Sequence, residues 1–357
     1  MIFLLLLIIP MLIASGFFIF GDKKVVWQEF LIHILAQLFV AGVCIGIIYT
    51  ANTFDTEIWN GKVLSKTRQV VHCRHSYQCH CVEVCSGSGK NETCHQVCQT
   101  CYDHSFDIDW DFTTSDNGIS YIDTIDRQGL QEPPRWTKII IGEPSSSSHI
   151  YTNYIKASEG TLFKRQGLVD KYKQYIPKYP NTIYDYYRIN RVVGINSPNI
   201  NYNNFNILLS KLNSEIGQDK QVNVVVVFVN NLPQEFYYAL EQAWIGGKKN
   251  DFIVVIGIED TIIKWTTVMA WVDDEYVKIK TRDDIITLSN INNYNSIIDV
   301  IQNNIISFYK RKPMHDFAYL QSSIVPTTTE LIVSLIINII VSIGLGFLFL
   351  NNDFFEV

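Results

Sequence analysis

Three long apolar segments stand out in the pattern of hydrophobic and polar positions. Met1 to Phe20 carries no charged residue, Val25 to Thr50 is almost purely apolar after a polar first half, and Leu331 to Leu350 has only Ser and Asn as polar side chains. Twenty helical residues reach about 30 Å, the thickness of a bilayer's hydrocarbon core. The pattern predicts transmembrane helices at 1–20, 26–50 and 330–350, the second with an interfacial start. A cleaved signal peptide is the alternative for the first segment, although that segment lacks a basic start.

The residues between the apolar segments predict a water-soluble region. Residues 52–150 contain short alternating stretches typical of a small β-rich module, with a turn at Trp59 to Gly61 and a strand at Lys62 to Val71. Residues 151–200 show no clean period and are expected to be an irregular connection, and residues 313–329 a linker. Asp116 to Gly118 suit a tight hairpin turn.

A second domain is predicted at 201–312. Val222 to Val229 and Phe252 to Ile258 are continuous apolar runs, as in strands covered on both faces, and a helical pattern lies between them. Ile263 to Trp271 alternates and should pair antiparallel. A helical pattern from Phe205 to Ile216 precedes this unit, with Gly217 as its expected cap. The predicted fold class is membrane-anchored α+β: three transmembrane helices, a small Cys/His-rich β module and an α/β layer domain with a mixed sheet.

The most unusual composition lies in residues 72–104, which hold seven of the eight cysteines and five of the eight histidines. Short spacings such as that of Cys98 and Cys101 let two thiolates reach one tetrahedral Zn²⁺. We therefore expect structural zinc, with these candidate ligands: Cys73, His75, Cys79, Cys81, Cys85, Cys94, His95, Cys98, Cys101 and His104.

Two alternatives to zinc stay open for this module. Disulfides would be favoured in an oxidising compartment, but seven is an odd number and Cys44 lies inside the second span. Histidine enrichment also has no role in disulfides. Thiol redox chemistry would require Cys98 or Cys101 to be unusually reactive.

Charge and motifs exclude some functions. The net charge is −6 and the basic residues are scattered, so nucleic-acid binding is not expected. No helical pair of His residues beside a Glu forms a metalloprotease motif. A divalent cation held by clustered carboxylates at turns of the α/β domain is one interpretation, and solvated turn residues are the plainer one. These carboxylates are Glu259, Asp260, Asp273, Asp274, Glu275, Asp283 and Asp284.

Two resemblances add to this picture. Asp55 to Gly61, the Cys/His module, Asp126 to Gly129 and Glu132 to Trp136 resemble a group of uncharacterised membrane proteins of tailed bacteriophages, which implies no known activity. Val222 to Trp271, with its polar turn from Ala243 to Asp251, is similar to the TPM domain family of membrane-tethered thylakoid-lumen and bacterial envelope proteins. That similarity implies an α/β fold and an extracytoplasmic location. Some family members are described as phosphatases, but no catalytic residue maps onto this sequence.

The expected function is that of a phage-encoded, membrane-anchored binding or scaffold protein without catalytic activity. Its expected partners are the lipid bilayer and another envelope or phage protein, and its expected location is the host inner membrane. Lys23 and Lys24 favour a cytoplasmic first loop and hence an extracytoplasmic soluble region. The alternative is a membrane-tethered, metal-dependent, phosphatase-like hydrolase that uses the carboxylates Asp273, Asp274 and Glu275.

Overall fold

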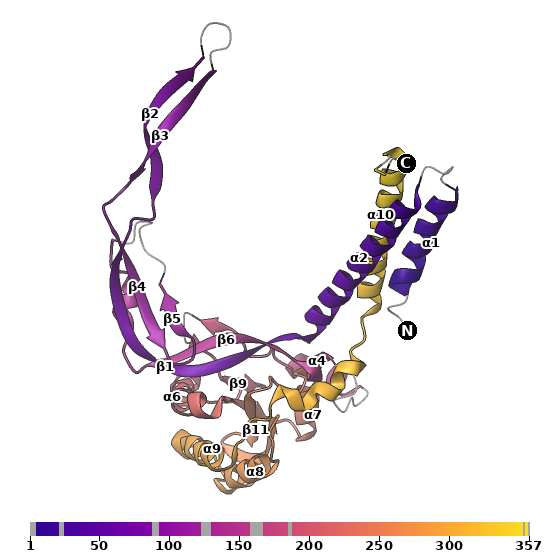
Figure 1. Ribbon diagram of the computed structural model, residues 1–357. Helices are drawn as coiled ribbons and strands as arrows, with labels where there is room; N and C mark the ends of the chain where they lie inside the picture. The colour runs from indigo at the N-terminus through magenta and orange to yellow at the C-terminus, as the bar shows by residue number, and fades with distance from the viewer. Residues whose placement is uncertain are drawn as a thin grey trace. The chain divides into compact units, whose positions relative to one another are not determined.

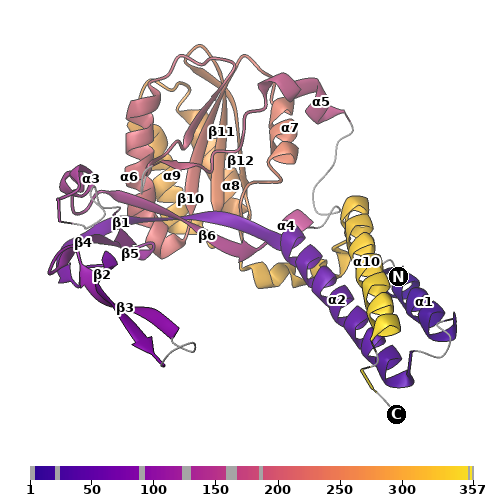
Figure 2. The same cartoon turned by 90° about the horizontal axis from the view of Figure 1, so that it is seen from above.

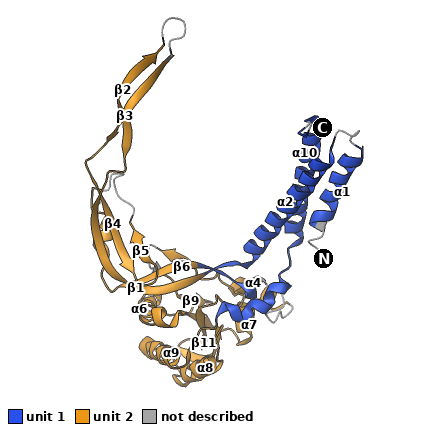
Figure 3. Ribbon diagram, viewed as in Figure 1, with its two compact units in different colours: residues 1–56, 150–163, 313–357 blue, residues 57–149, 164–312 orange. Residues whose placement is uncertain are grey.

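The computed structural model describes residues 5–20, 25–87, 93–122, 130–157, 167–184, 188–352 and 354–355. The fold is mixed α+β and includes a cysteine-rich β region, which confirms that part of the prediction. The chain forms two compact units (Figure 3), one of residues 1–56, 150–163 and 313–357 and the other of residues 57–149 and 164–312. Asp126 to Gly129, quoted above for the phage resemblance, lie outside the described residues.

The first unit is built on three apolar helices that pack side by side, α1 (Leu5–Phe20), α2 (Trp27–Thr53) and α10 (Thr328–Asn351) (Figures 1 and 2). It also holds the short helices α4 (Tyr154–Ala157) and η4 (Met314–Ser323). Helices α2 and α10 are long and apolar enough to cross a membrane. The prediction of three such helices was wrong, because only two of the described helices are long enough. Helix α1 has 16 described residues and reaches only about 24 Å.

Polar side chains of the apolar helices point into the bundle. Glu29, His33 and Gln37, from the polar first half of α2, are buried, and the interfacial start of this helix stays a prediction. The His33 Nε2 atom lies 3.0 Å from the Ser342 hydroxyl, which donates to the Pro10 carbonyl at 3.0 Å. His33 and Ser342 thus find their hydrogen-bond partners on neighbouring helices inside the bundle.

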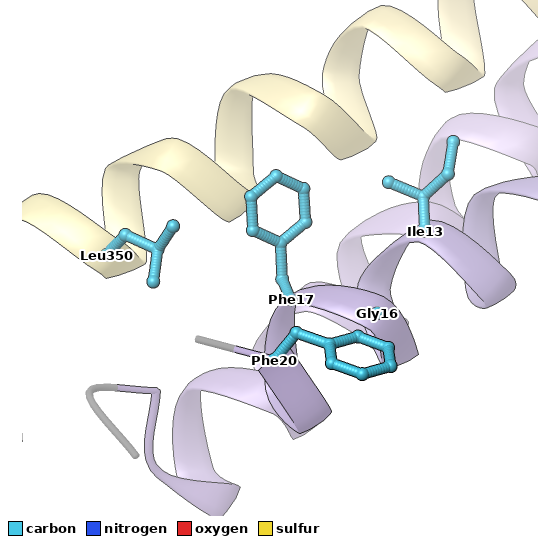
Figure 4. Close-up of a pocket in the computed structure, with 5 residues that line it drawn as sticks. All are labelled: Ile13, Gly16, Phe17, Phe20 and Leu350. Carbon is cyan, nitrogen blue, oxygen red and sulfur yellow. The ribbon is translucent and has the colours of Figure 1, made fainter. Parts of the chain in front are cut away.

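Helices α1 and α10 meet through aromatic rings, and Figure 4 shows Phe17 of α1 beside α10. The Phe17 ring lies edge-on to Phe347, with centroids 5.5 Å apart, and Gly346 leaves it room because a Cβ there would overlap it. An apolar hollow of about 350 Å³ lies beside this contact, lined by Ile13, Gly16, Phe17, Phe20 and Leu350. Its purely hydrocarbon lining offers no group for chemistry.

The second unit contains an antiparallel sheet in the order β5-β4-β1-β6. Its strands are β1 (Phe54–Val71), β4 (Asp107–Thr114), β5 (Gly118–Tyr121) and β6 (Pro144–Thr152), with helix α3 (Pro134–Lys138) before β6. The turn between β4 and β5 is the one predicted, with Gly118 at φ +74°. The turn predicted at Trp59 to Gly61 does not form: β1 runs through it, and Gly61 instead permits close packing, since a Cβ there would lie 2.8 Å from the Asp116 amide nitrogen.

The same unit contains an α/β layer with the strand order β12-β11-β10-β9. Strands β9 (Val192–Ile195), β10 (Asn223–Asn230) and β11 (Asp251–Glu259) are parallel, and β12 (Ile262–Ala270) is antiparallel to β11, as predicted. Helices α6 (Tyr202–Lys220), α8 (Tyr276–Thr287) and α9 (Tyr294–Phe308) cover one face of the sheet. Helices α5 (Leu168–Tyr172) and α7 (Glu235–Ala243) cover the other (Figure 2). The short elements η3 (Lys173–Tyr175), β7 (Ile183–Tyr184) and β8 (Arg188–Ile189) complete the unit.

The continuous apolar runs are explained by this layering. In β10, Val224, Val226 and Phe228 join the core on the α6 side, whereas the alternate residues join the core on the α7 side. Gly217 does not cap α6, which continues to Lys220. A Cβ at Gly217 would lie 2.6 Å from that of Asn60, so this glycine serves close packing.

Candidate functional site

Strands β2 (Ser76–Ser86) and β3 (Thr93–Tyr102) form a two-stranded antiparallel ribbon, and no other described strand pairs with either (Figure 1). The ribbon continues the β1/β4 pair, because Val71 of β1 pairs with Asp107 of β4 and Ser76 pairs with Tyr102. Almost all of its described side chains are exposed. A two-stranded hairpin with no covered face is at best marginally stable in water, so it needs another source of rigidity.

Three nested disulfides supply that rigidity: Cys79–Cys101, Cys81–Cys98 and Cys85–Cys94. The zinc prediction is therefore wrong, because six of its proposed thiolate ligands are bonded to one another. Cys79, His80 and Cys101 do lie close together, but the two sulfurs of this group are bonded to each other as a disulfide. Cys98 and Cys101 belong to different disulfides and so do not form a Cys-x-x-Cys redox pair.

Cys73 is the cysteine of the module that has no disulfide partner. Its buried thiol lies 3.5 Å from the His75 carbonyl oxygen and 3.9 Å from His104 Nδ1. The same ring nitrogen is 3.7 Å from the Asp107 carboxylate, which accepts a 2.7 Å hydrogen bond from the Arg74 amide. These contacts join the two chain segments at the base of the ribbon to the sheet.

The other predicted histidine ligands lie apart from one another. His75 Nδ1 is 3.8 Å from Asp103 at the base of the ribbon, and His95 is exposed on β3, opposite Val84. Within the described residues the ten predicted ligands therefore do not all converge, and of these ten only Cys73 and His104 lie in a close group that has no disulfide sulfur, together with Asp107.

The ribbon has two chemically different faces. Residues opposite one another in a ladder share a face, and successive residues alternate. His80 and Cys81 form a bulge in β2, with His80 at φ +45°, so the valines of both strands fall on the same face. We call this the valine face: Tyr77, Cys79, Val82, Val84, Ser86, His95, Val97, Gln99 and Cys101.

The opposite face carries the Cys81–Cys98 and Cys85–Cys94 disulfides, with Glu83 and Gln96 between them. On the valine face, Val82, Val97 and Tyr77 are 63%, 49% and 52% exposed. Val82 and Val97 are directly opposite each other, and Val84 follows Val82 on the same face, whereas Cys79 and Gln99 lie between them and Tyr77. The valine face thus carries a small cluster of exposed apolar side chains on a rigid support.

A buried polar cluster fastens the ribbon's sheet to the α/β layer. The Arg191 side chain is 1% exposed, and its guanidinium donates to the Asn60 and Ser146 side-chain oxygens and, at 3.2 Å, to Asn223. Burial lowers the pKa of Arg191 to about 9, an effect that the negative charge of Asp116 opposes. Because Asn60 is on β1 and Asn223 begins β10, the cluster makes the two sheets one body.

Sequence reasoning missed this cluster. Its residues lie far apart along the chain and form no motif, and Asn60 was assigned to a turn. The signal that was present is the run of small polar residues at the start of β6, Ser145 to Ser148, of which the first two are buried.

A second such joint holds the end of the α/β layer. The Nη2 atom of Arg311 donates to both carboxylate oxygens of Glu57 on β1, at 2.7 and 2.8 Å, and Glu57 is buried. The guanidinium therefore serves the fold rather than acting as a free basic group beside the third apolar segment.

The carboxylates of the alternative hydrolase hypothesis have local partners. Asp273 pairs with Lys310 at 2.9 Å, which holds the pKa of that carboxyl below its usual range, and Glu275 pairs with Lys278 at 2.5 Å. Asp274 accepts a hydrogen bond from the Tyr276 amide at the start of α8. Among described residues, these three do not form a group close enough to hold a metal ion.

Comparison with protein-family models, curated proteins and solved structures found no match. The resemblances to tailed-phage membrane proteins and to the TPM domain family therefore stay predictions.

Proposed function

We propose that this chain is a membrane-anchored binding protein whose disulfide-stapled ribbon is its binding element. The observation that carries the proposal is the combination of three nested disulfides with a solvent-exposed apolar face. A rigid element loses little conformational entropy on binding, so a modest apolar surface can still give useful affinity. This proposed function is binding and involves no catalysed reaction.

Membrane anchoring is supported by the way α2 and α10 distribute their side chains. A helix of a soluble bundle points its polar residues outward. Here the arrangement is inverted: Gln37 and Asn338 are fully buried, whereas Phe39 and Ile340 are 72% and 64% exposed. A lipid environment would satisfy those outward apolar faces, and α1 packs against both helices.

The disulfides support an oxidising location for the ribbon. Disulfides persist in extracytoplasmic compartments and are rare in the reducing cytoplasm. This agrees with the orientation expected from Lys23 and Lys24. The proposed setting is the outer side of a host inner membrane, with another envelope or phage-encoded protein as the partner class.

Site-specific photo-crosslinking in native membranes tests the proposal. A benzophenone amino acid replaces Val84 on the valine face or, as the matched control, the adjacent Glu83 on the opposite face. We expect a discrete crosslinked product from position 84 and little from position 83. Absence of any product from position 84, or equal diffuse labelling from both positions, would overturn the proposal.

A further inference from the structure

A polar pocket of the second unit is lined mainly by the β4–β5 hairpin and the first half of β6. It measures about 470 Å³, which lies within the range of small-molecule sites. Its lining is rich in aliphatic hydroxyl groups: Thr114, Ser120, Ser146, Ser147 and Ser148. None of the described lining residues belongs to the ribbon, so the pocket is separate from the valine face.

The walls of the pocket are fixed by the fold. The Ser146 hydroxyl accepts a 2.6 Å hydrogen bond from the Arg191 guanidinium and donates one of 3.0 Å to Asn60 Oδ1. The Thr114 hydroxyl accepts a 3.3 Å hydrogen bond from the Asn117 backbone amide. These contacts belong to the joint between the two sheets and to the β4–β5 turn. The polar groups are therefore held in place before a ligand arrives, as specific recognition requires.

One hydroxyl group of the lining has an unused bonding capacity. The Ser147 Oγ atom is shielded from solvent and has no hydrogen-bond partner among the described residues. Shielded polar atoms are normally hydrogen-bonded, and a serine hydroxyl reaches a new partner by rotation about one bond. A ligand that carries hydroxyl groups would supply that partner.

The charge of the pocket argues against several classes of ligand. Its described lining holds no Lys, Arg or His, and its one carboxylate, Asp116, would repel a phosphate or another anion. A single carboxylate falls short of the oxygen ligands that a cation such as Ca²⁺ requires. An apolar ligand would leave the serine hydroxyls unpaired. The lining therefore suits a neutral ligand with several hydroxyl groups.

Tyr121 adds a flat apolar surface to the pocket. Its side chain is 73% exposed, and that of Ile119, which also lines the pocket, is 57% exposed. A sugar ring carries hydroxyl groups around its edge and C–H groups on its faces, so it can bond to the serines while one face lies on the tyrosine ring. We infer that this pocket binds a saccharide. This binding activity goes beyond the proposed function and does not depend on the valine face.

Saturation-transfer difference NMR on the full chain tests the inference. The chain keeps its disulfides and is held in micelles of a detergent without a sugar headgroup, because an alkyl glycoside would compete for the pocket. The neutral probes are maltotetraose and chitotetraose, and the comparison compounds are tetragalacturonate and acetyl-tetraserine amide. We expect saturation to reach the ring protons of at least one neutral saccharide, and binding of both comparison compounds to be at least about tenfold weaker.

Three variants locate the binding in the pocket. Tyr121→Ala removes the ring and should weaken saccharide binding about threefold to tenfold, whereas Tyr121→Phe keeps the ring and should stay within about twofold of the unaltered chain. The matched control is Tyr319→Ala, which removes a tyrosine of η4 with a similar exposure of 71%. It should also stay within about twofold.

Each contrary result would overturn the inference. Absence of saturation transfer to both neutral saccharides would show that the pocket does not bind this class of ligand. Equal binding of the serine peptide would assign the pocket to peptides instead, and equal binding of tetragalacturonate would contradict the charge argument. Equal losses in Tyr121→Ala and Tyr319→Ala would place the binding elsewhere. None of these results affects the crosslinking test of the valine face, so the two proposals can fail separately.

Discussion

Removal of the middle disulfide should loosen the ribbon alone. Cys79–Cys101 and Cys85–Cys94 stay intact, so the middle bridge only divides the loop between them, which is about 13 residues long, into loops of about 8 and 5 residues. The loop-closure entropy of that division corresponds to about 1.6 kcal/mol at 25 °C. Since each 1.4 kcal/mol is a factor of ten, opening of the ribbon should become about 15-fold more frequent in a Cys81→Ser/Cys98→Ser variant.

Hydrogen exchange followed by mass spectrometry measures that opening on the full chain without reductant. Amides of β2 and β3 should exchange faster by about this factor, whereas amides of the buried strands β10 and β11 should keep their rates. The control variant is Cys44→Ser, which removes a cysteine of α2 that has no disulfide. Unchanged exchange in the ribbon would refute the argument that the staples stabilise it, and equal acceleration throughout the second unit would refute its independence.

Three further predictions concern the joints and the staples. Asn60→Ala removes an acceptor of the buried Arg191 guanidinium and should destabilise the second unit by about 3–5 kcal/mol in urea unfolding followed by Trp fluorescence, whereas the exposed Asn303→Ala should stay within about 0.5 kcal/mol. Gly61→Ala should cost about 1–3 kcal/mol in the same assay, because its new methyl group meets the Asp116 backbone; an unchanged midpoint would contradict the close packing of β1. A metal chelator should leave hydrogen exchange in the ribbon unchanged and a thiol reductant should accelerate it, and the reverse pattern would restore a metal-based explanation.

The sequence predicted those elements whose burial is visible in the pattern of apolar and polar residues within the element itself. Val222 to Val229 is apolar at every position because helices cover both faces of β10, and Ile263 to Trp271 alternates because β12 lies at the edge of the sheet. The sequence pattern does not show which way the buried polar residues of α2 face. A glutamine such as Gln37 fits the pattern equally well whether it faces lipid headgroups or the interior of a helix bundle.

The cysteine pairing could not be derived from the sequence, since six cysteines allow 15 connectivities. The choice among them follows from the register of the ribbon, which places Cys85 opposite Cys94 and brings Cys81 beside Cys98 across the bulge at His80. The odd seventh cysteine, which counted against disulfides, is Cys73, buried at the base of the ribbon. The histidines misled for a related reason: His80 and His95 are exposed residues of the ribbon, whereas His75 and His104 contact Asp103 and Asp107 at its base.

The position of Asn60 was also beyond local reasoning. The sequence has the composition of a turn at Trp59 to Gly61, but two of these residues make tertiary contacts instead. Asn60 accepts a hydrogen bond from Arg191, and Gly61 packs closely against the Asp116 backbone. Both contacts join residues more than 50 positions apart, so only the folded chain reveals them.

The central claim is that the cysteine module is a disulfide-stapled ribbon in an oxidising compartment. The most direct measurement is a count of free thiols in the full chain, isolated from its native membrane under acid-quenched conditions and denatured without reductant. We expect two free thiols per chain, Cys44 and Cys73, and eight after reduction. Eight free thiols before reduction would contradict the stapled ribbon, the extracytoplasmic location and the binding function built on them.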